Sequence, residues 1–329
     1  MDFGRLLGRM AAGAAGFSEP VRRRHAHGIL RSESPEGGFV GRAGKSDLYY
    51  TSFGLAGLAL LGQLSEETAQ RTAQVLVPAD TLAVKTNVLV PAAWDSLSLA
   101  EVVGLAACWA ILEAIFGLEK LFGSETSARW RPTVQERVRE FLTLVQRPDG
   151  GYAKHPRSPT SSTYATFLAG LVQQWIGLPI GEPEKTAPLL LARQRDDGGF
   201  AEWPSVQYGG TNPTAAAVGW WSLTGRIPTG VRDRAAAFLA SMQIADGGFR
   251  SHGRAPFSDL LSTFTGLAAM ELLEAGHAVD RRAARQYIAS LELAEGGFRA
   301  GFWDASADVE YTFYGLAGLA LLAEAADPT

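Results

Sequence analysis

The sequence predicts an all-α protein in which six helix-pair repeats close into one ring. A double glycine followed by an aromatic residue recurs along the chain, and its last four copies begin at residues 150, 198, 247 and 296, at intervals of 48, 49 and 49. An apolar segment of helical period precedes these glycine pairs, and a helix rich in small residues follows each loop. No run alternates convincingly with a period of two, so no large sheet is expected.

The elements follow this pattern in order. Residues 1–30 are expected to form a helical lead-in, and the repeats are set at about 31–77, 78–125, 126–177, 178–226, 227–275 and 276–325. The second repeat has lost its glycine pair. In each of the others the glycines permit a positive φ where the first helix ends, and a polar loop leads to the second helix. Six outer and six inner helices give a single-domain α/α toroid, an α6/α6 barrel, over residues 1–329.

Composition excludes several classes of protein. The 329 residues are 47% hydrophobic and 19% charged, which suits a packed core rather than a disordered chain. A formal net charge of −4 provides no general attraction for nucleic acid. The longest apolar stretch, 102–112, is shorter than the ~20 residues that span a bilayer, so no transmembrane segment and a cytoplasmic location are expected. The single cysteine, Cys108, lies in that stretch and is assigned to the core.

The repeats and their tails resemble the prenyltransferase and squalene-oxidase repeat superfamily. The closest resemblance is to the β subunits of protein farnesyl- and geranylgeranyltransferases, whose final unit has the form Gly-Gly, loop, Asp-x-x-His-Thr and an apolar helix. The corresponding residues here run from Asp308 to Thr312 and continue into FYGLAGLALL. The first unit matches the same template from Gly41 to Thr51. The resemblance implies an α/α toroid with a central isoprenoid cavity.

The same resemblance indicates a degenerate zinc site. In the transferases an Asp and a Cys two residues apart, together with the His of the last unit, hold the zinc. Here Asp259 is present, but Leu261 stands at the Cys position and Tyr311 at the His position; Tyr50 is the equivalent in the first unit. A zinc thiolate site is therefore not expected. The acid motifs of the terpene cyclases, Asp-x-Asp-Asp and Asp-Asp-x-x-Asp, do not occur.

Basic residues in the loops are candidates for binding a diphosphate. Arg42 and Lys45 are placed as the transferases place their diphosphate-binding Arg and Lys, and Arg250, His252 and Arg254 occupy the equivalent loop of the fifth unit. The alternative is that these basic residues are ordinary solvated charges on surface loops.

Acidic and aromatic residues at the starts of inner helices are the other candidates. Asp47, Asp259 and Asp308 recur at helix starts, where they are candidate catalytic residues or helix caps. Asp308 with Glu310, or Asp259, could instead supply oxygen ligands for Mg²⁺ beside a diphosphate. Tyr50 and Tyr311 are candidates to stabilise an allylic cation or to donate a hydrogen bond to a leaving diphosphate. The expected cavity wall comprises Tyr49, Tyr164, Trp220, Trp303 and Tyr314. The alternative is that these tyrosines and tryptophans are half-buried aromatic residues of the core.

Two functional hypotheses follow. In the first, the protein is like a prenyltransferase β subunit: it binds an isoprenoid diphosphate and carries out zinc-independent prenyl transfer or terpenoid cyclisation, with or without an α-subunit-like partner. In the second, it is a non-catalytic toroid that binds another lipid or a protein partner.

Overall fold

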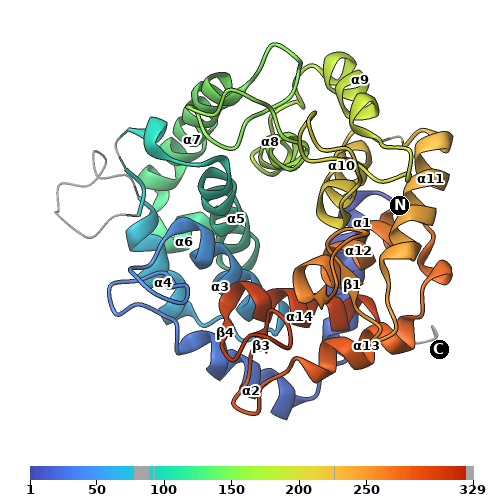
Figure 1. The fold of residues 1–329 in the computed structure, drawn as a ribbon. Coiled ribbons are helices and arrows are strands. Elements are labelled where there is room, and N and C mark those ends of the chain that lie inside the picture. Colours follow the sequence, from blue (N-terminus) through green and yellow to red (C-terminus); the bar gives the residue numbers. More distant parts are fainter. Residues whose placement is uncertain (78–88, 92, 226, 324–329) are drawn as a thin grey trace, which may run out of the picture.

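The computed structural model describes residues 1–77, 89–91, 93–225 and 227–323. Within them, an inner ring contains α3 (Leu48–Leu60), α5 (Leu99–Phe116), α8 (Thr163–Trp175), α10 (Thr211–Leu223), α12 (Leu260–Leu272) and α14 (Val309–Leu321). Each inner helix packs against the next, and α14 packs against α3, which closes the ring (Figure 1). The predicted all-α toroid is confirmed.

An outer layer surrounds the inner ring. It contains α2 (Glu19–Leu30), α4 (Glu66–Leu76), α7 (Ser124–Val145), α9 (Pro183–Arg193), α11 (Thr229–Met242) and α13 (Arg281–Ser290). Shorter elements are α6 (Leu118–Phe122) and two 3₁₀ turns at Trp94–Ser96 and Gly276–Ala278. The strands β1 (Phe249–Arg250) and β2 (Ser258–Asp259) pair antiparallel, as do β3 (Phe298–Arg299) and β4 (Ala307–Asp308). These pairs brace the loops that enter α12 and α14.

The aromatic residue after each Gly-Gly packs under the following inner helix. A Cβ atom at Gly54 of α3 would lie 2.4 Å from the ring of Phe39, and one at Gly315 of α14 would lie 2.4 Å from the ring of Phe298. Glycine is therefore required at these two positions so that the ring can reach the helix backbone. Phe39 and Phe298 are completely buried as a result.

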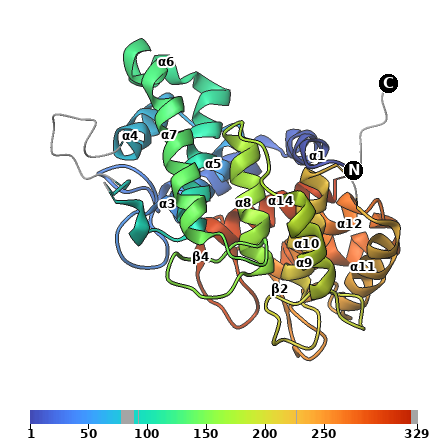
Figure 2. The same cartoon turned by 90° about the horizontal axis from the view of Figure 1, so that it is seen from above.

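The acid before the glycine pair ties the turn to the start of the inner helix. Asp149 accepts hydrogen bonds from the Gly151 amide at 3.1 Å and from the Ser161 hydroxyl at 2.6 Å. In the next two units Asp197 accepts from the Gly199 and Gly209 amides, and Asp246 accepts from the Gly248 amide and the Ser258 hydroxyl. The loops before α8, α10, α12 and α14 lie on one side of the ring, which we call the rim (Figure 2).

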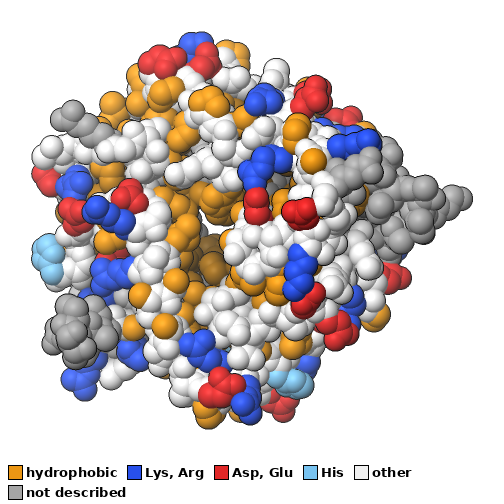
Figure 3. Space-filling model, turned by 180° about the vertical axis from the view of Figure 1, so that it is seen from behind, with side chains coloured by type: hydrophobic (Ala, Val, Ile, Leu, Met, Phe, Trp, Pro, Cys, Tyr) orange, Lys and Arg blue, Asp and Glu red, His pale blue; other side chains and the backbone are white. Residues whose placement is uncertain are grey.

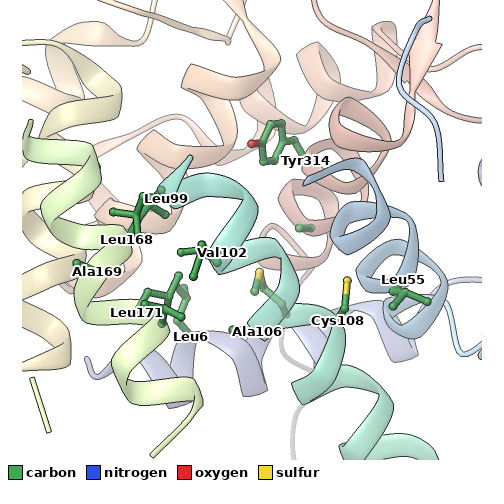
Figure 4. Close-up of a cluster of buried hydrophobic side chains, with 14 of the residues drawn as sticks. Leu6, Leu55, Leu99, Val102, Ala106, Cys108, Leu168, Ala169, Leu171 and Tyr314 are labelled. Atoms are coloured by element: carbon green, nitrogen blue, oxygen red, sulfur yellow. The ribbon is translucent and has the colours of Figure 1, made fainter. Parts of the chain in front are cut away.

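The N-terminal helix α1 (Phe3–Ala15) crosses the other end of the ring. It packs mainly against α14, where a Cβ at Gly13 would lie 2.0 Å from the Ala320 carbonyl oxygen. Figure 4 shows Leu6 of α1 in one buried cluster with Val102 of α5 and Leu171 of α8. α1 thus seals part of the inner ring.

The helix α2 lies in the outer layer rather than only leading into it. It packs on α3 and α14, and its His25 ring stacks on Phe298 at 5.1 Å. The predicted repeat boundaries stay a prediction, but α2 occupies the outer position before the first glycine pair.

The helix α5 is long and apolar enough to span a membrane by length and composition, and no other described helix is. It packs between α3 and α8 in the inner ring, and half of its apolar window is buried there. Cys108 is completely buried on this helix, as predicted. The position of α5 in the packed inner ring explains its apolar composition.

Candidate functional site

A cavity of about 490 Å³ opens at the rim where the first and last repeats meet. α3, α14 and the loop before α14 provide its walls. Its lining residues are Arg42, Tyr50, Ala300, Trp303, Asp304, Asp308, Glu310 and Tyr311. Ring closure therefore brings together six of the residues predicted from sequence: Arg42, Tyr50, Trp303, Asp308, Glu310 and Tyr311.

Arg42 is held by two carboxylates at the mouth of this cavity. Its Nε donates to Asp308 at 2.9 Å and its Nη1 donates to Asp304 at 3.0 Å, while the guanidinium lies 5.6 Å from the centre of the Tyr311 ring. The hydrogen bonds to Asp304 and then Asp308 raise the pKa of Arg42. Burial works against ionisation of Asp304, but Arg42 and two backbone amides bring the pKa of this carboxyl below its usual value. The positive charge of Arg42 is thus already balanced by Asp304 and Asp308.

Asp308 also begins α14, because its carboxylate caps the helix by accepting from the Tyr311 amide at 2.9 Å. Its side chain is only 3% exposed. The cap turns the first residues of α14 towards the cavity and places Glu310 on its wall.

Glu310 lies deeper in the site and is hydrogen bonded by two phenols. Tyr49 of α3 donates to its Oε1 at 2.7 Å, and Tyr314 of α14 donates at 3.0 Å. Burial raises the pKa of Glu310, and the two phenol donors only partly offset that rise. Burial next to Glu310 and Asp308 raises the pKa of Tyr311 to about 12, so its phenol stays protonated.

Aromatic rings continue from this carboxyl group into the centre of the ring. Phe53 of α3 contacts Phe313 of α14 at 5.6 Å, and Phe313 contacts Phe264 of α12 at 5.9 Å. All three are only partly buried. Figure 3, which views the opposite face, shows a hollow at the middle of the ring bordered by hydrophobic side chains. Aromatic rings therefore extend from the Glu310 carboxyl group towards the apolar centre of the ring.

Lys45 and Asp47 belong to a second cavity of about 210 Å³, which Glu36 and Glu101 also line. Asp47 caps α3 by accepting from the Tyr50 amide at 2.8 Å, and burial raises its pKa. Lys45 is exposed. The structure thus separates the predicted pair Arg42 and Lys45 into neighbouring cavities.

Asp259 has a capping role at α12. It accepts from the Ser262 amide at 2.6 Å and from the Ser262 hydroxyl at 2.8 Å. Burial raises its pKa. It does not line the 490 Å³ cavity.

The basic residues of the fifth loop group around a different aromatic residue. The rings of His252 and Tyr208 lie 5.1 Å apart, and the Arg254 guanidinium is 5.1 Å from the Tyr208 centroid. Arg250 begins this loop at the end of β1. These residues lie on the rim but do not line the cavity beside Arg42.

The remaining predicted wall residues have different surroundings. Trp220 is 2% exposed and packs near Gly170 of α8, so it belongs to the core and not to a cavity wall. Tyr164 is partly buried below Lys154, whose Nζ lies 5.8 Å from the ring centre.

No group of three His, Cys, Asp or Glu side chains among the described residues is arranged to hold a metal ion. Asp308 binds Arg42, whereas Glu310 binds Tyr49 and Tyr314, so the two carboxylates proposed as Mg²⁺ ligands have different partners.

Sequence reasoning missed Asp304 and the three phenylalanines. Phe53, Phe264 and Phe313 follow Tyr49, Leu261 and Glu310 at helical spacings of four and three, which could have indicated one inward face. Asp304 had no such signal, because only the fold places its loop beside Arg42.

The fold and the site define a helical toroid with a polar mouth over an aromatic centre. The chain belongs to the prenyltransferase α-α toroid domain family, whose model matches residues 22–80 and 104–328. No curated protein sequence matches the chain.

Solved structures show the same fold at low sequence identity. Protein geranylgeranyltransferase-I of Candida albicans, complexed with GGPP, is 14% identical, with 92% of this chain and 91% of that chain covered and a TM-score of 0.66. The type II terpene cyclase MstE from Scytonema is 11% identical over 97% and 98% of the two chains, with a TM-score of 0.56. A variant of that cyclase in complex with geranylgeranyl dihydroxybenzoate is 12% identical over 97% and 96%, with a TM-score of 0.55. The protein therefore has the toroid fold of prenyltransferases and terpene cyclases.

Proposed function

We propose that this protein binds an isoprenoid chain in its central ring and starts a terpenoid cyclisation by protonating that chain, with Glu310 as the acid. The position of the Glu310 carboxyl group carries the proposal. It lies on the cavity wall, is held by two phenols and is followed by the aromatic rings of the centre.

The surroundings of Glu310 suit a proton donor. Burial raises its pKa, which keeps the carboxyl protonated closer to neutral pH. The hydrogen bonds from Tyr49 and Tyr314 stabilise the carboxylate once the proton has left. The Glu310 carboxyl group is therefore available as an acid, and its carboxylate is stabilised after the proton has left.

The chemical step balances without a cofactor. The O–H bond of Glu310 breaks as the π electrons of an alkene form a new C–H bond, and a tertiary carbocation results. The next double bond attacks that cation and closes a ring, and the final cation returns a proton to the carboxylate. The faces of Phe53, Phe264 and Phe313 are suitably placed to stabilise positive charge along this path.

Charge at the mouth favours a substrate without a diphosphate. Arg42 already binds two carboxylates, so an anionic head group would have to displace Asp304 or Asp308. Geranylgeranyltransferase-I was solved with GGPP, whereas the cyclase variant carries geranylgeranyl dihydroxybenzoate. The second head group, an aromatic ring with at most one negative charge, would meet less repulsion from Asp304 and Asp308 than a diphosphate.

Incubation in D₂O with detergent-dispersed geranylgeranyl arenes and linear polyprenes tests the proposal. We expect cyclised products that carry one deuterium, detected by mass spectrometry. Glu310→Gln keeps the shape but lacks the acid, so turnover should fall by ~100-fold or more. Glu101→Gln is the matched control, because Glu101 also lies in the first turn of an inner helix but caps only α5.

Turnover of Glu310→Gln at the parent rate would contradict the role of Glu310. Prenyl transfer from geranylgeranyl diphosphate, without cyclisation, would support the transferase hypothesis instead. Saturable binding of the isoprenoid with no product would support a non-catalytic lipid-binding toroid.

A further inference from the structure

Asn212 of α10 is a polar residue of the inner ring that lines neither of the two rim cavities. It belongs to a set of six equivalent positions, because each inner helix carries one residue two places after its N-cap. All six are partly exposed, and we call them the first-turn layer: Tyr49, Ala100, Tyr164, Asn212, Leu261 and Glu310. Asn212 is the amide of this layer.

The first-turn layer surrounds the centre of the ring. The inner helices pack in the order α3, α5, α8, α10, α12, α14 and back to α3, so α8 faces α14 and α10 faces α3 across the centre (Figure 1). Residues of the layer on opposite helices influence one another: burial and then the charge of Glu310 raise the pKa of Tyr164 to about 12. Asn212 therefore lies on the wall opposite Tyr49, whose phenol binds Glu310.

The neighbouring helix fixes the Asn212 side chain. Thr265 of α12 donates from its Oγ1 to Asn212 Oδ1 at 2.6 Å. This bond uses the oxygen of the amide, and among the described residues no hydrogen bond uses the two N–H groups on Nδ2. With the amide flipped, one N–H would donate to Thr265, whose hydroxyl would donate to the Leu261 carbonyl at 2.9 Å, and the other N–H would still be left. Asn212 thus keeps a donor in either orientation.

The backbone that carries Asn212 is also held. Thr211 donates from its amide to the Ser251 carbonyl at 2.8 Å and from its hydroxyl to the Arg250 carbonyl at 2.6 Å. These bonds tie the start of α10 to the loop of the next repeat. An acceptor that binds to the Asn212 amide would therefore cost the protein little conformational entropy.

The neighbours of Asn212 on the inner face are apolar. Ala215 follows it by three residues on α10, and Leu261 and Phe264 are partly exposed on α12. A hydrocarbon that displaces water from this wall leaves the amide N–H groups without a partner, whereas a hydroxyl, ether or carbonyl oxygen satisfies them. This wall therefore discriminates between ligands by the presence of an acceptor oxygen.

We propose that Asn212 binds an acceptor oxygen of an oxygenated isoprenoid and so holds the substrate opposite Tyr49 and Glu310. The inference rests on the isoprenoid binding of the proposed function but not on the cyclisation. Once the oxygen is fixed at one wall, its distance along the chain determines which alkene reaches Glu310. Asn212 is thus a residue that determines specificity, and it takes no part in proton transfer.

Calorimetric titration with three detergent-dispersed ligands tests the proposal: geranylgeraniol, its methyl ether, and the hydrocarbon with a methyl group in place of the hydroxyl. We expect the parent protein to bind the alcohol and the ether about fivefold to tenfold more tightly than the hydrocarbon. The ether accepts but does not donate, so it reports on the N–H groups alone. Asn212→Asp keeps the shape and the acceptor for Thr265 but has no N–H, so its preference for the ether should disappear. Asn212→Leu should lose the preference for both oxygenated ligands.

Thr224→Val is the matched control, because Thr224 ends the same helix and donates to the Trp220 and Trp221 carbonyls. It should keep the parent preference, and thermal unfolding of all variants separates ligand binding from folding. Equal affinity of the parent for the three ligands overturns the proposal, as does an unchanged ether preference in both Asn212 variants.

The same titrations separate this proposal from the cyclisation. A preference for oxygen that depends on Asn212, without any cyclised product, supports the binding role of Asn212 and overturns the cyclisation. Cyclisation without such a preference overturns the role of Asn212 alone. Failure of the parent to bind any of the three ligands overturns both.

Discussion

Two carboxyl groups only two residues apart on α14 have opposite environments. Asp308 faces a guanidinium and the free amides of a helix start, so its charge is satisfied. Glu310 faces phenols and apolar rings, and burial raises its pKa. Spacing alone does not separate the capping carboxylate Asp308 from the proposed acid Glu310. The partners that the fold brings to each oxygen make that difference.

His25 provides a test at the scale of a single residue. Its Nδ1 accepts from the Gly297 amide at 3.1 Å, and its side chain is 1% exposed. Burial and the charge of Arg24 lower the pKa of His25 from 6.5 to about 4. As the pH falls below 6.5 the unfolded chain takes up a proton that the folded chain does not, so stability falls until about pH 4.

We therefore expect the parent protein to lose up to about 3 kcal/mol more unfolding free energy across that interval than His25→Asn. The Asn carbonyl can still accept from Gly297 but does not titrate. Urea unfolding at a series of pH values measures the difference. Parallel pH profiles for the two proteins would show that His25 is not held neutral.

At the scale of elements, the repeat depends on close approach between an aromatic ring and an inner helix. Thr51 of α3 accepts from the Phe39 amide at 2.9 Å, and Thr312 of α14 accepts from the Phe298 amide at 3.3 Å. These bonds hold the ring in place while a glycine leaves room for it. Both partners lie within one repeat, so the same arrangement recurs in the first and last units.

Gly54→Ala is expected to destabilise the protein by about 1–3 kcal/mol, because its methyl group would overlap the Phe39 ring. Gly8→Ala on α1 is the control: no atom outside its own helix lies within 4 Å of the added Cβ, so higher helix propensity should stabilise it slightly. Chemical denaturation of both variants provides the comparison. Equal effects would show that Phe39 moves aside at little cost.

At the scale of the whole molecule, ring closure assembles the site and α1 crosses the opposite end. The α-amino group of Met1 donates to the Leu272 carbonyl at 3.1 Å and lies 2.9 Å from Glu274. Phe3 contacts Phe167 of α8 at 6.1 Å. α1 thereby connects several inner helices that are distant in sequence.

Removal of residues 1–16 should open the ring without unfolding it. The side chain of Glu271, now 6% exposed, would lose Arg9 but keep Arg281 at 2.5 Å. We expect a lower unfolding temperature together with increased binding of a hydrophobic dye. Arg5→Ser, on the exposed side of α1, should change neither measurement. Unchanged dye binding by the truncated protein would show that α1 does not cover the apolar centre.

The sequence by itself determined the repeat, the helix pairs and the closed ring, because glycine spacing, capping residues and helical period are local properties of the chain. It also predicted Arg42, Tyr50, Asp308 and Tyr311 as candidate site residues, and the structure places all four around one cavity. Only the tertiary structure decided that Arg42 is neutralised by Asp304 and Asp308, that Lys45 lies in another cavity and that Glu310 is surrounded by phenols. The bonds from Arg42 to Asp308 and from Tyr49 to Glu310 join the first repeat to the last, across more than 250 residues. The charge balance of Arg42 and the burial of Glu310 therefore depend on closure of the ring.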